Sequence, residues 1–220
     1  MQKKHKKPDT TVAAEEGFKV VGMVRAACED IVKAGGIEIE VAGSLRRGLE
    51  RVHDVDIVIV FKDKKLRLED VVRRVLAMYD NNQRIEKSMA AYMAIDTIPS
   101  ISISSISSIP SILSKTKAKT EMQTEIQQPT KHRQRDAVWL GGVLVDLYAT
   151  TPEERGAMML FATGSKEFNI QMRSAAKKKG LKLNQYGLFC QKTGRKVCSA
   201  RTEKDIFGWL GMEFVPPNKR

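Results

Sequence analysis

Two aspartates separated by one residue stand at the start of the most apolar run of the chain, and this feature most constrains the fold. Residues 55–61 (Val-Asp-Ile-Val-Ile-Val-Phe) are β-branched and aromatic, which predicts a buried strand. Because side chains alternate along a strand, Asp54 and Asp56 share one face, roughly 7 Å apart. Neighbouring carboxylates repel one another and raise each other's pKa. A divalent cation removes that penalty, and all-oxygen ligation suits magnesium.

The segment that precedes this strand carries groups suited to phosphate. Gly43 and Ser44 form a small-residue turn, whose backbone amides and hydroxyl can donate to phosphate oxygens. Two arginines follow, and a guanidinium binds phosphate through paired hydrogen bonds. The segment from Gly43 to Asp56 therefore predicts half of a metal-dependent nucleotide site. Taken alone, the two aspartates are also compatible with a solvated strand end.

Length and composition indicate a globular protein without a membrane span. The chain has 220 residues and is 42% hydrophobic, enough for one large domain or two small ones. No run approaches the roughly 18 apolar residues of a transmembrane helix, and the lysine-rich start lacks the apolar region of an export signal. Three cysteines without zinc spacing suit a reducing compartment. We therefore expect an intracellular protein, in the cytoplasm or in the nucleus of a eukaryote.

Positive charge is concentrated at the two ends of the chain. The formal charge is +12, of which residues 155–220 contribute a net +10 and residues 1–12 a net +3, so the middle is nearly neutral. A basic half beside a metal-site half predicts a polyanion held against a catalytic centre. A basic surface without a partner is the alternative.

Sequence periodicity divides the first part of the chain. We predict a basic flexible tail over 1–12, a helix over 13–34, a strand over 37–41, a helix around 68–79 and a short strand over 92–95. Residues 97–135 begin with serines and isoleucines and continue with Lys, Thr and Gln. This low-complexity composition predicts an inserted loop or a disordered excursion, to which we assign no function. Because the isoleucines recur at a spacing near three, a short helix or an aggregation-prone segment is the alternative.

The second part carries one more aspartate on a predicted strand. Segments 137–140 and 143–149 flank Gly141-Gly142, a hairpin signal, and the second of these strands contains Asp146. A helix with Phe168, Met172, Ala175 and Ala176 on its apolar face follows Ser165 and ends at Gly180. We predict a hairpin over 181–198 with its turn near Thr193-Gly194, then a last helix capped by Thr202 and Asp205.

These motifs, in this order, resemble those of the DNA polymerase X family, the polymerase beta-like enzymes. The palm motif corresponds to Gly43-Ser44-Leu45-Arg46-Arg47-Gly48 followed by Asp54-Val55-Asp56, and Val145-Asp146-Leu147 is similar to the strand with the third carboxylate. Thr163-Gly164-Ser165 resembles the family's hinge. Phe168-Asn169 with Met172-Arg173 resembles the helix that inspects the new base pair, and residues 203–220 resemble the family's carboxyl-terminal end.

The resemblance implies both a fold and an activity. The fold would be α/β (α+β): a nucleotidyltransferase palm with a mixed sheet over 13–150, interrupted at 97–135, and a small basic α/β subdomain over 151–220. The activity would be DNA-directed DNA synthesis by a monomer, filling short gaps in repair. Its partners would be primer-template or gapped DNA and dNTP, with no membrane. The family's lyase and helix-hairpin-helix modules have no room before Gly43, so we expect weak, salt-sensitive synthesis.

The resemblance also assigns roles to single residues. Asp54 and Asp56 would bridge two Mg²⁺ ions, for which Mn²⁺ could substitute, while Asp146 would hold the first ion nearest the primer 3′-hydroxyl. The residues of the nucleotide site would be Gly43, Ser44, Arg47, Gly164 and Asn169. Arg47 is the candidate for the β- and γ-phosphates, whereas Arg46 either lies at the surface or contacts an acid.

Asn169 and Arg173 are the candidates for contact with DNA and with the new base pair. They would reach the minor-groove side, where contacts cannot easily distinguish sequence. Their alternative is a polar helix face in water. Two functions remain as rivals: a nucleotidyltransferase that modifies a small molecule or a protein, and a catalytically silent DNA-binding module.

Overall fold

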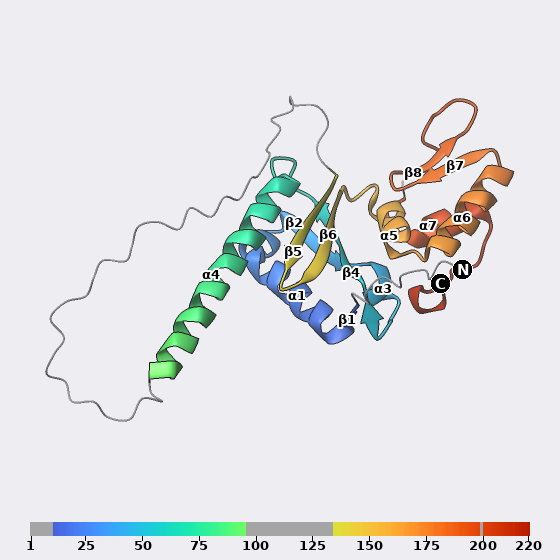
Figure 1. Ribbon diagram of the computed structural model, residues 1–220. Helices are drawn as coiled ribbons and strands as arrows, with labels where there is room; N and C mark the ends of the chain where they lie inside the picture. The colour runs from blue at the N-terminus through green and yellow to red at the C-terminus, as the bar shows by residue number, and fades with distance from the viewer. Residues whose placement is uncertain (1–10, 96–133, 199) are drawn as a thin grey trace, which may run out of the picture. The chain divides into compact units, whose positions relative to one another are not determined.

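A computed structural model describes residues 11–95, 134–198 and 200–220 (Figure 1). Two compact units divide the chain, one formed by residues 1–80 with 132–220 and the other by residues 81–131. The division falls inside helix α4 (Leu68–Ile95). The first unit holds every predicted site residue and all the strands of the described chain.

A four-stranded mixed sheet organises the amino-terminal half of this unit. Its strands are β2 (Ile37–Val41), β4 (Asp54–Phe61), β5 (Arg135–Leu140) and β6 (Val143–Thr150), in the order β2-β4-β6-β5. The central pair, β4 and β6, is parallel, whereas β2 and β5 are antiparallel edge strands. The four strands predicted for this sheet and the Gly141-Gly142 hairpin are confirmed, and both turn glycines have positive φ (58° and 80°), as a tight hairpin turn requires.

One face of the sheet is covered by helices. These are α1 (Ala14–Ala27), α2 (Glu29–Lys33) and the first part of α4. Alternate residues of the central strands, Val55, Ile57, Val145 and Leu147, are fully buried against them. Burial of such a cluster is the main favourable contribution to folding.

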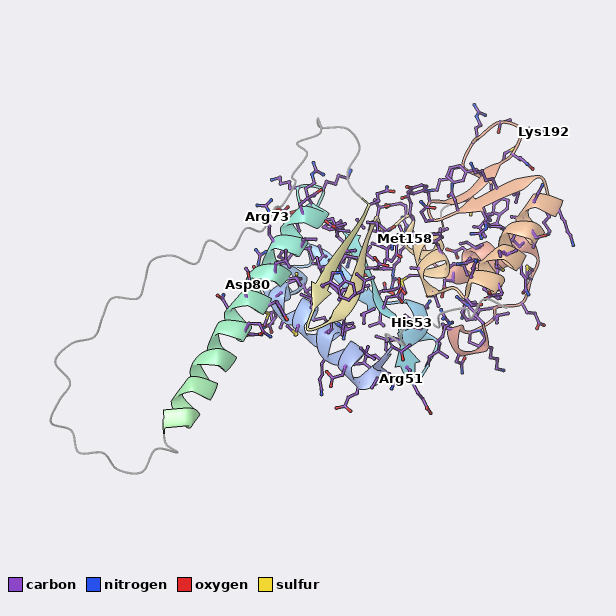
Figure 2. The ribbon with its side chains drawn as sticks, viewed as in Figure 1. Arg51, His53, Arg73, Asp80, Met158 and Lys192 are labelled. Carbon is purple, nitrogen blue, oxygen red and sulfur yellow. The ribbon has the colours of Figure 1, made fainter. Side chains whose placement is uncertain are left out.

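The opposite face carries the aspartates at one end and packs against α5 (Arg155–Thr163) at the other. Val58 and Val60 of β4 form a small buried cluster with Met158, Met159 and Ala162 of α5. Figure 2 labels Met158 among the side chains around this strand. Asp54 and Asp56, at the end of β4 next to α3, lie outside this apolar cluster.

The carboxyl-terminal part surrounds a second core. It contains α6 (Lys166–Lys178), β7 (Leu181–Asn184), β8 (Gly187–Cys190), α7 (Glu203–Leu210) and a short 3-10 turn (Pro217–Lys219). Phe168, Met172 and Ala176 of α6 are buried in this core, as their spacing predicts. Thr202 and Asp205 form the predicted capping box of α7, which is confirmed.

Several predicted elements differ from the structure. The first helix breaks at Cys28, whose backbone (φ −119°, ψ 15°) is not helical. Phe18 has the apolar spacing of Val21 and Val24 but is 52% exposed, and Gly17 is the residue that lies against Leu45. Val12, assigned to the tail, pairs with Val52 as β1 (Val12–Ala13) against β3 (Arg51–Val52). The rest of the predicted tail up to residue 10 lies outside the described residues.

Three further predictions also change. The strand predicted over 92–95 is wrong, because α4 continues to Ile95. The segment predicted as one hairpin over 181–198 contains two turns. The predicted turn near Thr193-Gly194 is present, because the Gly194 amide donates to the Cys190 carbonyl and Phe189 forms an antiparallel bridge with Lys196. A further turn at Gln185-Tyr186 joins β7 to β8, and Asn184 Oδ1 accepts a hydrogen bond from the Tyr186 amide there. Arg135, assigned to the insertion, begins β5, whereas residues 96–133 are not described.

None of the helices in the described part of the chain combines the length and the apolar character that a membrane-spanning segment needs.

Candidate active site

The three predicted carboxylates lie on one face of the two central strands. Asp56 of β4 and Asp146 of β6 are register partners in the parallel pair, and Asp54 is opposite Leu144. Because partners in register point to the same side of a sheet, Asp56 and Asp146 are neighbours, and Asp54 lies two residues along the same face. The structure therefore brings together residues that are 90 positions apart in sequence.

Asp56 lies in a partly buried position, where its ionised form is disfavoured. Burial raises the pKa of its carboxyl to about 7, and the charges of Asp54 and Asp146 add to the shift. A hydrogen bond with the Tyr148 hydroxyl and the charge of Arg135 oppose it. A carboxylate in this position is stabilised by any cation that comes close.

Arg135 supplies a positive charge to the third carboxylate. Asp146 is only 3% exposed, and its Oδ2 lies 2.7 Å from Nη2 of Arg135. The guanidinium also lies over the Tyr148 ring, 5.5 Å from its centre. Arg135 and Tyr148 are cross-strand partners on β5 and β6. The sequence prediction missed both residues, because Arg135 stood at the end of the predicted insertion and Tyr148 was assigned only to a strand.

The turn before these strands forms a short helix, α3 (Gly43–Arg46), directly beside Asp56. Gly43 has φ +60°, and a Cβ atom there would lie 2.8 Å from Cγ of Asp56, closer than real side chains approach. Glycine is thus required on two counts, the backbone conformation and the space. The Ala42 amide also donates to the Asp56 carbonyl, which fixes α3 against β4.

Ser44 lies in α3 and Arg47 directly follows this helix; both were predicted to contact phosphate. The Ser44 hydroxyl is buried without a hydrogen-bond partner within the described residues. A buried polar group of this kind is ordinarily satisfied by a ligand or water. Arg47 donates from Nη1 to the carbonyl of Thr163, and the same nitrogen lies close to Gly164. The predicted nucleotide residues Arg47 and Gly164 are thereby neighbours.

Arg46 pairs with an acid, one of the two roles predicted for it. Its guanidinium binds Glu203 of α7 through two hydrogen bonds, of 2.7 and 3.0 Å, and Thr163 Oγ1 at 2.6 Å. Arg220, whose side chain is fully buried, donates to the same carboxylate at 2.6 Å. Burial alone would raise the pKa of Glu203, but the two arginines hold it below its usual range. This cluster ties α3 to the carboxyl-terminal part.

Asn169 and Arg173 lie on α6, on a face that lines a small hollow with Phe161 and Asn184. Nδ2 of Asn169 donates to the Phe161 carbonyl at 2.8 Å, and Ser165 caps the start of the helix. Both side chains line this hollow, because residues four positions apart lie on the same face of a helix. Neither contacts the carboxylates.

The donor set is compatible with magnesium, because three carboxylates supply only oxygen ligands and their mutual repulsion is relieved by a cation. Within the described residues, however, no three His, Cys, Asp or Glu side chains are already arranged around a metal position. Asp146 is instead turned to Arg135, which provides the charge that a cation would supply. Ion binding therefore requires Asp146 to exchange its partner.

Comparison with known proteins is consistent with this geometry. The DNA polymerase beta palm matches residues 12–138, more than half of the chain, and the DNA polymerase beta thumb matches residues 158–220. The chain is 27% identical over 210 residues to the repair DNA polymerase X of African swine fever virus (strain Badajoz 1971 Vero-adapted), covering 93% of this chain and 97% of the viral protein.

Two longer proteins are also similar to this chain, which covers a smaller share of each of them. The DNA nucleotidylexotransferase of Ambystoma mexicanum is 26% identical over 192 residues, covering 83% of this chain and 36% of that protein. The DNA-directed DNA/RNA polymerase mu of Homo sapiens is 42% identical over 81 residues, covering 36% of this chain and 16% of that protein.

The mixed sheet, in a segment that matches the polymerase beta palm, identifies the protein as a nucleotidyltransferase. The match of the carboxyl-terminal segment to the polymerase beta thumb identifies the class of nucleotidyltransferase. The chain belongs to the DNA polymerase X family and is a DNA polymerase, whose substrates are DNA and deoxynucleoside triphosphates. The polymerase beta palm family uses divalent metals.

Proposed function

We propose that this protein fills short gaps during DNA repair, as a monomer, and that Asp54, Asp56 and Asp146 hold two Mg²⁺ ions for nucleotidyl transfer. The observation that carries the proposal is the register of β4 and β6, which aligns Asp56 with Asp146 on the face beside α3. Mn²⁺, with the same preference for oxygen ligands, would substitute. The name of the viral relative, a repair DNA polymerase X, supports the role in repair.

Bound at these carboxylates, the ions would lower the pKa of the primer 3′-hydroxyl and stabilise the triphosphate and the leaving pyrophosphate. Asp54 and Asp56 would hold both ions, and Asp146 the ion on the primer side. The buried Ser44 hydroxyl, free of other partners among the described residues, would donate to a phosphate oxygen. Arg47 would exchange the Thr163 carbonyl for the β- and γ-phosphates.

The nucleoside would lie toward α5 and α6. Gly164 leaves space beside Arg47, and Asn169 and Arg173 line the hollow on α6. From there the two side chains would contact the minor-groove edge of the new pair, where the four pairs look alike in most positions. Such contacts would test pair geometry without selecting a sequence.

The decisive experiment measures extension of a gapped duplex with each dNTP, with and without Mg²⁺, for wild type and Asp146→Ala. We expect template-directed incorporation that requires the metal and is lost in the variant. Asp30→Ala is the matched control, because Asp30 pairs with Arg74 on the helical side of the protein. Activity of Asp146→Ala equal to wild type would refute the assignment of Asp146.

The same assay separates the rival functions. Magnesium-dependent turnover of dNTP without any primer would indicate a nucleotidyltransferase acting on another acceptor. Extension of a primer without a template would indicate a terminal transferase, as the name of the Ambystoma relative suggests for that protein. DNA binding without any incorporation would indicate a silent binding module.

A further inference from the structure

The edge strand β5 presents an indole on the face that carries the carboxylates. Trp139 is 66% exposed, the largest exposed fraction among the bulky hydrophobic residues of the described chain. It is the register partner of Leu144, and Ala137 is the partner of Asp146. Because partners share a face, Trp139, Leu144 and Asp54 form one row across three strands, and the row of Ala137, Asp146 and Asp56 lies next to it.

The strand order indicates where a primer would approach, given the proposed function. The proposed phosphate contacts are Ser44, in α3, and Arg47, directly after it; α3 follows β2 and lies beside β4. In an in-line displacement the attacking oxygen lies opposite the leaving group. Across the order β2-β4-β6-β5, the side opposite α3 is that of β6 and β5 (Figure 1). A 3′-hydroxyl would therefore arrive at Asp146 from over β5.

Along β5, two residues flank the position opposite Asp146 on the same face, and they differ in their contacts with other described residues. On one side Arg135 is engaged with Asp146 and lies over Tyr148, and Tyr148 in turn meets the Phe161 ring edge-on at 6.3 Å. On the other side Trp139 is exposed. Ala137, the register partner of Asp146, has a small side chain, which leaves room between Trp139 and Asp146.

We propose that Trp139 binds the primer terminus, packing its indole against the sugar and base of the last primer nucleotides. As a diagonal neighbour it stands roughly 7–8 Å from Asp146, about the reach of an aromatic side chain. Base–aromatic stacking tolerates any sequence, because every base has a π-face. A polymerase needs this tolerance at its primer terminus. The inference rests on the proposed two-metal site and adds a residue that neither motif nor charge predicts.

The chain contains only two tryptophans, which makes a direct binding test available. Trp209, the second, is 52% exposed on α7. In a Trp209→Phe protein all indole fluorescence comes from Trp139, and in Trp139→Phe all of it comes from Trp209. We expect a gapped duplex with a primer strand to quench Trp139, and the same duplex without the primer to leave its emission unchanged. Quenching that is independent of the primer would overturn the proposal.

Steady-state extension supplies the second readout. We expect Trp139→Ala to weaken primer binding roughly 5- to 150-fold, the range typical of lost base stacking, with the KM for dNTP and the thermal unfolding temperature unchanged. Trp139→Phe should retain most of the affinity. The dependence of affinity on salt should also keep its slope, because an indole neutralises no phosphate. Trp209→Ala is the matched control and should bind primer as wild type does.

Failure of this inference and failure of the proposed function give different results. Wild-type primer affinity in Trp139→Ala, together with lost activity in Asp146→Ala, would overturn the role of Trp139 and leave the two-metal site standing. Primer-dependent quenching of Trp139 in a protein without magnesium-dependent synthesis would support the role of Trp139 and refute the polymerase site.

Discussion

Replacing Gly43 by alanine tests how closely α3 must approach the proposed metal ligands. Gly43 has φ +60°, and the added Cβ would lie 2.8 Å from Cγ and 3.0 Å from Cβ of Asp56. Asp56 or the start of α3 must therefore move. Gly48, in the same motif, has φ +80°, and a Cβ atom added there would meet no described atom within 4 Å. Gly48→Ala therefore carries the conformational penalty without the overlap.

The two contributions can be estimated separately. A left-handed backbone costs a non-glycine residue about 1–2 kcal/mol. Relief of an overlap in a packed region costs about 1–3 kcal/mol more. We therefore expect a free energy of unfolding lower by about 1–2 kcal/mol in Gly48→Ala and by about 2–5 kcal/mol in Gly43→Ala. For catalysis, displacement of Asp56 by an ångström would lower kcat by about 100-fold.

Urea unfolding, followed by circular dichroism, measures the stabilities, and single-nucleotide gap filling measures kcat. The informative quantity is the difference between the two variants, since both share the change from glycine to alanine at positive φ. Equal losses of stability and of kcat in the two proteins would refute the idea that Gly43 is needed to accommodate Asp56.

Three further predictions concern charge and capping. Glu203→Ala should lower the free energy of unfolding by about 3–5 kcal/mol, because it leaves the buried Arg220 unpaired. Since the pKa of Glu203 is lowered on folding, this contribution is present above about pH 4.3 and is lost as the pH falls further. A difference in free energy of unfolding between wild type and variant that stays the same in acid, measured by urea unfolding, would contradict the prediction. Without metal, Asp56→Asn should be more stable than wild type at pH 8, with a difference that grows from about pH 4 to pH 7, because the raised pKa of Asp56 makes its ionisation unfavourable in the folded protein. Thermal unfolding measures this, and added Mg²⁺ should stabilise wild type more than the variant. Thr202→Ala should cost about 1 kcal/mol in urea unfolding through loss of the capping box, and an unchanged midpoint would contradict the cap's role.

Local features of the fold could be predicted because their causes are local. The β-branched run of β4, the glycine pair between β5 and β6, and the apolar spacing of α6 each act within a few residues. The turn near Thr193-Gly194 was predicted for the same reason, whereas a second turn in that segment was missed. The missed turn at Gln185-Tyr186 contains no glycine or proline and depends on a hydrogen bond from the Tyr186 amide to Asn184.

The candidate site was predictable in its residue types and not in its contacts. The aspartates and the glycine turn lie in recognisable motifs, so Asp54, Asp56, Asp146 and Gly43 could be named from sequence. Arg135 could not, because its role depends on pairing with Asp146 across an antiparallel register that begins just after a low-complexity segment. Arg46 and Glu203, 157 positions apart, likewise meet only in the folded chain.

The sequence by itself determined which segments become strands and helices, and which side chains can carry negative or positive charge to a nucleotide. Only the tertiary structure decided that Asp56 and Asp146 are register partners, that Arg135 neutralises Asp146, and that Trp139 is exposed beside them. The physical reason is that strand register is fixed by how the opposite face packs against α1 and α4. A shift by one residue would turn every one of these side chains to the other side of the sheet.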